Sequence, residues 1–195
     1  MLRSKGRSFS LMNYLSINTC DQANGPGLRV SIFVSGCSVH CKGCFNQESW
    51  DCNAGKPFDL DAYQALFKAL DNDYISGLSI LGGDPFEESN MPVVHGIVQE
   101  FRNRFKDTKT IWIWSGRKFG HLIDHHYLAP YILELCDVLV DGPYIESKKI
   151  TEQGRWFGSE NQRVLLLSDK AKNWWMHNAH KYMYMHLNVF GVYNP

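Results

Sequence analysis

The chain has 195 residues, of which 44% are hydrophobic, and this is enough apolar material to bury a core without disulfide bridges. Its 20 basic residues balance 20 acidic residues, so the net charge gives no reason to expect a partner that is a nucleic acid. No Pro/Ser-rich or strongly charged block divides the sequence, which predicts a single domain over residues 1–195.

The first residues, from Met1 to Arg7, are basic, but the apolar run of a signal peptide does not follow them. No stretch of the sequence approaches the length of a membrane span. We therefore expect a cytoplasmic protein with no membrane partner, in which cysteine thiols stay reduced.

Apolar runs alternate with helical periods along the chain, which is typical of βα units around a parallel sheet. The run Arg29–Val34 predicts a buried strand, and Ser35 and Gly36 end it directly before a group of cysteines. From Leu60 onward the spacing predicts a helix that Asp59 or Asp61 caps. The apolar stripe of this helix consists of Tyr63, Leu66, Phe67 and Leu70.

The second half of the chain continues this alternation. Residues 78–81 predict a strand, which the turn Gly82-Gly83-Asp84-Pro85 follows. A second amphipathic helix, with Ser89 as its expected cap, is indicated by Val94, Ile97, Val98, Phe101 and Phe105. Further strands are predicted at residues 110–114, 138–140 and 163–167. The sequence therefore predicts the α/β fold class.

Glycine and polar residues follow the predicted strands at the points where the strands end. These residues are Gly36-Cys37, Gly82-Gly83-Asp84, Ser115-Gly116 and Asp141-Gly142-Pro143. Because parallel α/β folds bind ligands at the carboxyl ends of their strands, we expect these turns to surround one site. The two glycines at 82 and 83 would let the backbone approach a ligand closely, and carbonyls there can accept hydrogen bonds from an ammonium group.

Three cysteines, Cys37, Cys41 and Cys44, lie within eight residues. Iron-sulfur clusters are normally held by four thiolates, so three ligands from one loop leave one iron open to a small molecule. A zinc site is a second possibility, but no second Cys pair or His signature completes the pair Cys41/Cys44. A third possibility is an electron carrier in which Cys52 or His40 closes the cluster, although His40 neighbours Cys41 and is expected to point elsewhere.

The cysteine spacing resembles the signature of the radical S-adenosylmethionine enzymes. Over about residues 12–167 the chain is most similar to the activating proteins of anaerobic ribonucleoside-triphosphate reductases. The segments that carry this resemblance are Asn24–Arg29, Cys37–Asn46 with Trp50, Gly82–Pro85, Trp112–Gly116, Asp137–Gly142 and Arg155–Arg163. The Gly-Ser-x-Asn-Gln-Arg stretch and the short chain favour this family over the longer pyruvate formate-lyase activase.

The resemblance implies an incomplete, open parallel β/α barrel of the radical S-adenosylmethionine type. It also implies that Cys37, Cys41 and Cys44 hold a 4Fe-4S cluster whose fourth iron is chelated by S-adenosylmethionine. Reductive cleavage of this molecule would give a 5′-deoxyadenosyl radical that abstracts hydrogen from a glycine of the anaerobic reductase large subunit. The implied electron donor is a protein such as flavodoxin. Activation of another glycyl-radical enzyme, such as pyruvate formate-lyase, stays open as an alternative.

The resemblance also assigns roles around the cluster. Gly82, Gly83 and Asp84 match the turn that receives the methionine amino group, although many members have Glu where this chain has Asp84. Cofactor contacts, with a turn or loop-capping role as the alternative, are expected at Asn46, Ser115 and Asp141. A segment that faces the partner or the cofactor is expected at Arg155, Asn161, Gln162 and Arg163.

Other conspicuous residues are expected to be structural. His121 and His125 are spaced i, i+4 but lack a Glu of the metalloprotease type, so we expect them and His126 to be surface histidines. Cys20, Cys52 and Cys136 are expected to be ordinary core or surface thiols.

An aromatic-rich extension occupies about residues 168–195. It contains Trp174, Trp175, Met176, Tyr182, Met183, Tyr184 and Met185. We expect the extension to cover an otherwise open side of the sheet, and a tail that docks the partner is the alternative.

Overall fold

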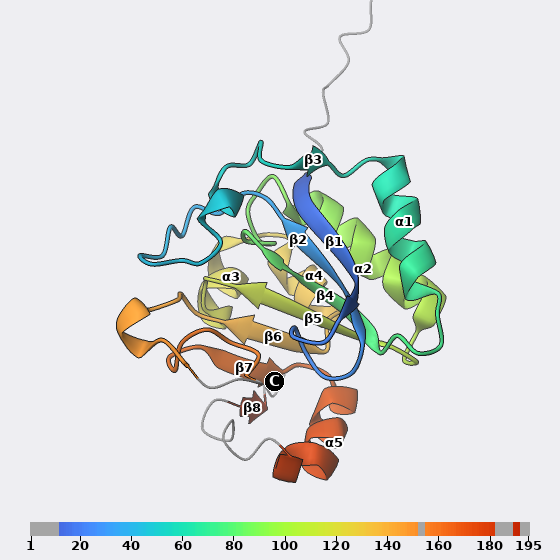
Figure 1. Ribbon diagram of the computed structural model, residues 1–195. Coiled ribbons are helices and arrows are strands. Elements are labelled where there is room, and N and C mark those ends of the chain that lie inside the picture. The colour runs from blue at the N-terminus through green and yellow to red at the C-terminus, as the bar shows by residue number, and fades with distance from the viewer. Residues whose placement is uncertain (1–11, 152–154, 182–188, 192–195) are drawn as a thin grey trace, which may run out of the picture.

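The computed structural model describes residues 12–151, 155–181 and 189–191, which contain one mixed sheet with the strand order β3-β1-β2-β4-β5-β6-β7-β8 (Figure 1). The strands are β1 Asn13–Asp21, β2 Arg29–Val34, β3 Lys56–Pro57, β4 Gly77–Gly82, β5 Thr110–Ser115, β6 Val138–Asp141, β7 Arg163–Leu166 and β8 Val189–Gly191. The helices are α1 Leu60–Leu70, α2 Met91–Phe105, α3 Phe119–His125, α4 Ala129–Glu134 and α5 Asp169–Asn178, with 3-10 turns η1 Gln47–Trp50 and η2 Glu146–Lys148. Because β3 and β8 are the outer strands, the sheet is open.

The four strands β2, β4, β5 and β6 run parallel, which confirms the expected βα order for this part of the sheet. In contrast, β1 runs antiparallel to β2 and β7 runs antiparallel to β6, so the sheet is not parallel throughout. The register pairs Val34 with Gly82, and it pairs Asp141 with both Ser115 and Arg163. The ends of the four parallel strands and the start of β7 therefore share one edge of the sheet, the carboxyl edge.

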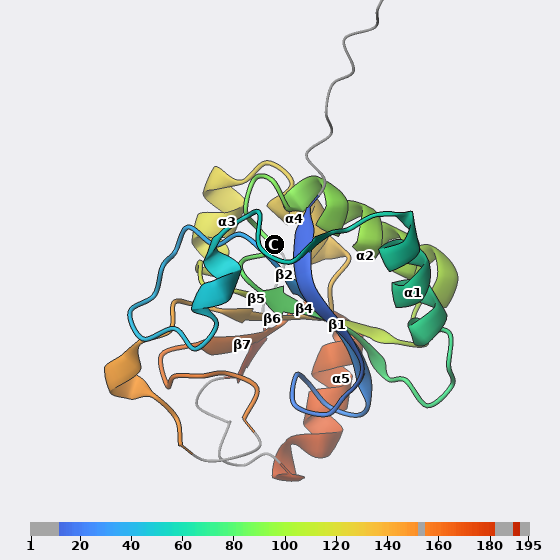
Figure 2. The ribbon, with the colours of Figure 1, turned by 45° about the horizontal axis from the view of Figure 1, so that its top comes forward.

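Helices cover both faces of the sheet. The helices α1, α2 and α4 lie on one face and α5 lies on the other (Figure 2). Because strand side chains alternate between faces, Ile111 and Ile113 join the core beneath α2, whereas Trp112 between them joins a second core with Val140 and Ala171.

The start of α1 agrees with the sequence prediction, since the Asp59 carboxylate accepts a hydrogen bond from the Ala62 N–H at 3.0 Å. The prediction of Ser89 as the cap of α2 was wrong, because the N-cap position is Asn90. The Asn90 side chain instead donates to the carbonyls of Ser35 at 2.8 Å and Asp84 at 3.0 Å. This residue thereby fastens the start of α2 to the carboxyl edge.

Three strands and three helices of the described residues were not predicted, namely β1, β3 and β8, and α3, α4 and α5. The strand β1 is only partly buried along most of its length, so its sequence lacks the continuous apolar run of a buried strand. The helices α3 and α4 span 7 and 6 residues, too few to show a clear helical period. On α3, His121 and His125 are exposed, as expected.

The described part of the C-terminal extension covers the second face of the sheet, as expected. The helix α5 begins at a cap formed by Ser168, whose hydroxyl accepts from the Ala171 N–H at 3.1 Å. The ring of Trp174 lies 6.2 Å, centroid to centroid, from that of Trp156. The residues further on, Tyr182, Met183, Tyr184 and Met185, lie outside the described residues. No helix in the described ranges is long and apolar enough to cross a membrane.

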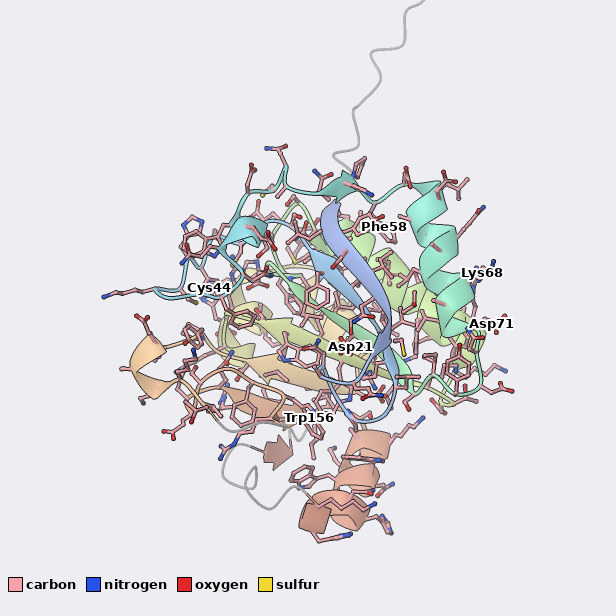
Figure 3. The ribbon with its side chains drawn as sticks, viewed as in Figure 1. Asp21, Cys44, Phe58, Lys68, Asp71 and Trp156 are labelled. Atoms are coloured by element: carbon pink, nitrogen blue, oxygen red, sulfur yellow. The ribbon has the colours of Figure 1, made fainter. Side chains whose placement is uncertain are left out.

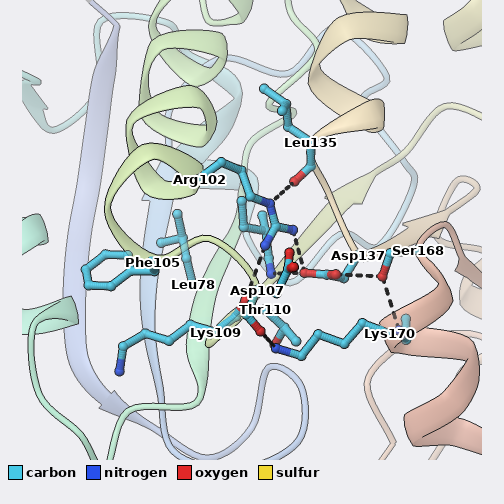
Figure 4. Close-up of polar contacts among 12 residues, drawn as sticks. Leu78, Arg102, Phe105, Asp107, Lys109, Thr110, Leu135, Asp137, Ser168 and Lys170 are labelled. Carbon is cyan, nitrogen blue, oxygen red and sulfur yellow. Dashed lines mark hydrogen bonds and ion pairs between the residues drawn. The ribbon is translucent and has the colours of Figure 1, made fainter.

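A buried carboxylate joins α2, β5, β6 and α5 (Figure 4). Asp137 is 2% exposed and accepts from the Arg102 guanidinium at 2.7 Å and from the Ile111 N–H at 2.7 Å. Its other oxygen accepts from the hydroxyl of Ser168 at 2.6 Å, the same residue that caps α5. One side chain therefore fixes the position of α5 against the sheet.

We expect Asp137→Ala to lower the free energy of unfolding by about 3 kcal/mol, because it leaves a largely buried guanidinium and a buried N–H without their acceptor. Urea denaturation measures this change. The control is Glu100→Ala, which removes the partner of Arg104 in an exposed i, i+4 pair and is expected to cause no measurable change. Equal effects of the two substitutions would contradict the prediction.

Candidate active site

The cysteine loop, residues 35–46, leaves the end of β2 at the carboxyl edge, where Figure 3 labels Cys44. Its start is tied to η1, since the Gly36 N–H donates to the Ser49 carbonyl at 2.7 Å and the Cys37 N–H to the Trp50 carbonyl at 3.1 Å. Gly36 has a φ of +94°, which favours glycine, and a Cβ there would lie 2.9 Å from the sulfur of Cys52. The first cysteine is therefore held at a defined point directly after the strand.

The donor set suits an iron-sulfur cluster. Cys37, Cys41 and Cys44 are free thiols, each partly exposed. The Asn46 N–H donates to the sulfur of Cys44 at 3.4 Å, and backbone groups of Val39 and His40 near Cys37 and of Tyr144 near Cys41 act to lower the pKa of these two thiols. Hydrogen bonds to cluster sulfurs are a usual means of tuning such centres.

The described residues include no group of three or more His, Cys, Asp or Glu side chains arranged to hold a single metal ion. Thiolates that bind three different irons lie around the corners of a cluster, so they need not converge on one point as the ligands of one ion do. The candidate fourth ligand His40 packs its ring on that of Trp50, with centroids 4.6 Å apart.

Burial sets the protonation of the cysteine thiols. It raises the pKa of Cys37 to about 11, and it also raises the pKa of Cys41. Both groups are therefore neutral thiols near pH 7 unless a cation compensates the thiolate charge. Cluster assembly must displace these protons, as is general for thiolate ligands.

The turn after β4 lies directly against the start of the cysteine loop. The Gly83 N–H donates to the Val34 carbonyl and the Asp84 N–H donates to the Gly36 carbonyl, both at 2.7 Å. A Cβ on Gly83 would lie 2.4 Å from the Gly36 carbonyl oxygen. Gly82 has a φ of +113°, so both glycines are required by the backbone geometry.

Asp84 is completely buried, and its carboxylate points into the protein. It accepts hydrogen bonds from the Phe86 N–H at 2.9 Å, the Ser115 hydroxyl at 3.0 Å and the Gly116 N–H at 3.2 Å, and it pairs with Arg117 at 2.7 Å. Burial raises the pKa of Asp84 although Arg117 acts in the opposite direction. The carboxylate therefore joins the turns after β4 and β5 and is not free to contact a ligand.

The three other predicted cofactor contacts differ in what their side chains do. The Ser115 hydroxyl donates to Asp84 and accepts from the Arg117 N–H at 3.0 Å. Asp141 is buried, accepts from the Phe119 N–H at 2.7 Å and pairs with Arg163. The side-chain amide of Asn46 has no hydrogen-bond partner among the described residues, so of the three it is the side chain that can contact a ligand without losing an internal bond.

The predicted partner-facing residues Asn161, Gln162 and Arg163 fold onto the turn after β6. The Gln162 carbonyl oxygen accepts from the N–H groups of Gly158 and Ser159, and its amide donates to Gly142 at 3.0 Å. The Asn161 amide donates to the Pro143 carbonyl at 2.7 Å. These side chains brace the loop, and Arg155 beside them is partly buried.

An exposed aromatic ring stands next to the last cysteine. Phe45 is 87% exposed, and its ring meets that of Tyr144 edge to face with centroids 6.4 Å apart. On the same side, a Cβ on Gly43 would lie 2.7 Å from the carboxyl carbon of Glu146. The loop around η2 therefore forms one wall of the site.

Sequence reasoning did not identify Ser38, Glu87 and Arg117, which meet at the start of the cysteine loop. A signal was present, since Glu87 follows Asp84 by three residues and Arg117 follows Ser115 by two. Both therefore had to lie near the carboxyl edge, but spacing alone does not give the direction of their side chains.

Comparisons with known proteins agree with this geometry. The sequence matches the family described as a 4Fe-4S single cluster domain over residues 23–165, a range that includes the cysteine loop and extends past Arg163. The anaerobic ribonucleoside-triphosphate reductase-activating protein of Enterobacteria phage T4 is 36% identical over 167 residues, which cover 86% of this chain and 100% of the relative. Proteins of the same name from Vibrio cholerae and Escherichia coli K12 are 39% and 36% identical, over 78% of this chain and 97% of each relative.

In cluster-free, reduced protein at pH 8, we expect iodoacetamide to label the exposed Cys20 and Cys52 first, Cys37 on the order of tenfold more slowly, and the buried Cys136 last. The reason is that burial leaves little Cys37 as thiolate, so its labelling rate should keep rising until the pH reaches about 11. Peptide mass spectrometry over time measures the order, with Cys20 as the internal standard. Labelling of Cys37 as fast as that of Cys20 would contradict the prediction.

Proposed function

Because this chain belongs to the family of anaerobic ribonucleoside-triphosphate reductase-activating proteins, we propose that it generates the glycyl radical of such a reductase. The observation that carries the proposal is the cysteine loop, which places three free, partly exposed thiols at the carboxyl edge. Cys37, Cys41 and Cys44 would hold the 4Fe-4S cluster and leave one iron without a protein ligand. When bound, the cluster would supply one electron for the cleavage of S-adenosylmethionine, and the resulting 5′-deoxyadenosyl radical would take hydrogen from a glycine.

The residues around the cluster bind and orient the cofactor in this proposal. The methionine amino group would lie at the backbone of the Gly82-Gly83 turn, where carbonyl groups can accept its hydrogen bonds. The uncommitted amide of Asn46 offers both a donor and an acceptor to the ribose or the carboxylate. Phe45 and Tyr144 provide an apolar wall that limits access of water to the reacting atoms.

We further propose that the open sheet is an incomplete β/α barrel and that residues 1–195 form one domain, with the family-like core at about 12–167 and the extension at 168–195. The open topology and the position of α5 on the second face support this interpretation. The six cysteines are all free, which supports a reducing compartment such as the cytoplasm.

The proposed partners are the large subunit of the anaerobic reductase, which supplies the glycine, and an electron donor such as flavodoxin. The names of the relatives support the reductase over pyruvate formate-lyase. An open barrel suits a macromolecular substrate, because a loop of the partner must reach the cofactor.

A closed cluster that only carries electrons is the second candidate, and one observation favours it. The sulfur of Cys52 lies beside Gly36, the residue before Cys37, so a fourth thiol is near the cysteine loop. The two candidates differ in whether Cys52 is a ligand.

Electron paramagnetic resonance of the anaerobically reconstituted, reduced protein separates the candidates. We expect S-adenosylmethionine to perturb the cluster signal of the wild type and of Cys52→Ala, because the open iron is retained, whereas Cys44→Ala should lose the cluster. Iron and sulfide content provides the independent measure of cluster loading. A Cys52→Ala protein that loses the cluster, together with a wild-type signal that does not respond to S-adenosylmethionine, would instead establish the electron carrier.

The activity itself is tested by adding the anaerobic reductase, S-adenosylmethionine and a chemical reductant such as dithionite. We expect a glycyl radical signal on the reductase, at most one per polypeptide, and none with Cys44→Ala because the cluster is absent. Pyruvate formate-lyase is the control partner. A radical on pyruvate formate-lyase but not on the reductase would overturn the partner assignment.

A further inference from the structure

A compact ionic cluster holds the residue that follows the first cysteine. The Ser38 N–H donates to Glu87 Oε1 at 2.6 Å, and the Ser38 hydroxyl donates to the same oxygen at 2.9 Å. Arg117 Nη2 donates to Ser38 Oγ and to Glu87 Oε1, both at 2.8 Å. We call Ser38, Glu87, Arg117 and Asp84 the Ser38 clamp.

The charged side chains of the clamp are largely shielded from water, whereas Ser38 itself is exposed. Arg117 lies between two carboxylates, with its Nη1 2.7 Å from Asp84 Oδ2, and the side chains of Arg117 and Glu87 are only 12% and 15% exposed. Hydrogen bonds between charged groups are stronger than neutral ones, and partial burial reduces their screening. The three members beyond Ser38 come from the turns after β4 and β5, so the clamp connects these turns to the cysteine loop.

Cys37 is therefore fixed from both sides. Its own N–H is bonded to the Trp50 carbonyl, and the next residue is held by Glu87 and Arg117. The negative charges of Asp84 and Glu87 raise the pKa of Cys37, so they disfavour negative charge on its sulfur. Arg117 pairs with both of these carboxylates and carries the opposite charge.

We propose that Glu87 and Arg117 are positioning residues that fix the cysteine loop at Ser38 and set the ease with which the cluster is reduced. This inference rests on the proposed function, because it concerns the cluster that Cys37 would bind. Reduction adds one negative charge to the cluster. A nearby carboxylate disfavours that charge and a nearby guanidinium favours it, so the two residues act in opposite directions on the midpoint potential.

The positioning role is tested in cluster-free protein by hydrogen exchange of the Ser38 amide. Glu87→Ala removes the acceptor, so we expect exchange at Ser38 to be about tenfold to a hundredfold faster, as for the loss of a hydrogen bond to a charged group. Glu87→Gln keeps an acceptor oxygen and should restore most of the protection. Unchanged exchange in Glu87→Ala would overturn the positioning role, whether or not the protein binds a cluster.

The electrostatic role is tested by redox titration of the reconstituted protein, monitored by electron paramagnetic resonance, with dithionite as the reductant. Glu87→Gln is expected to raise the midpoint potential and Arg117→Gln to lower it, whereas Arg117→Lys keeps the charge and should stay near the wild type. Arg104→Gln, a change in an exposed ion pair on α2, is the control. Thermal unfolding of each variant identifies any that is not folded.

Shifts of the same sign in Glu87→Gln and Arg117→Gln, or shifts no larger than that of the control, would overturn the electrostatic role. If the clamp has only a structural role, both substitutions loosen the same loop. The two midpoint potentials would then not be expected to shift in opposite directions. If the wild type forms no cluster, the proposed function fails, and the exchange of Ser38 still decides whether Glu87 positions the loop.

Discussion

The site depends on the close contact between the turn after β4 and the end of β2. The two amides of Gly83 and Asp84 bond to the carbonyls of Val34 and Gly36, and the oxygen of Gly36 occupies the space where a side chain of residue 83 would be. This contact brings the start of the cysteine loop and the glycine turn together without any mediating side chain. The distance between the two therefore depends on backbone geometry, which is stiffer than a contact between long side chains.

Around this contact, acidic residues connect the loops of the carboxyl edge. Asp84 receives donors from the turn after β5, and Asp141 receives the Phe119 N–H at the start of α3 and the guanidinium of Arg163. A buried carboxylate can accept several hydrogen bonds at once and is costly to bury without them, so it suits a position where separate loops converge. Most of the polar side chains that the sequence suggests as ligand contacts thus connect the loops of the carboxyl edge. Asn46 and the exposed Phe45 stay available to a ligand.

The sequence allowed much of this fold to be predicted, for physical reasons. The strands from β2 to β7 other than β3 are short, mostly apolar and largely buried, and the stripe of α1 follows from its burial on one side. The strand β1 was not predicted, because a strand that is only partly buried lacks a continuous apolar run. In the site, the convergence of Asp84 and Ser115 could be predicted from the strand ends, but their mutual hydrogen bond could not. The direction of a side chain depends on tertiary contacts such as those of Arg117, which no spacing encodes.

The antiparallel course of β7 has a consequence for how such a protein can diversify. Because β6 ends at the carboxyl edge and β7 begins there, both ends of the intervening loop are fixed at the same edge, by Asp141 and Arg163. Insertions or substitutions in the middle of that loop alter the surface beside the cysteines without displacing a strand. Recognition of different partners can therefore evolve in this segment while the residues that handle the electron stay unchanged.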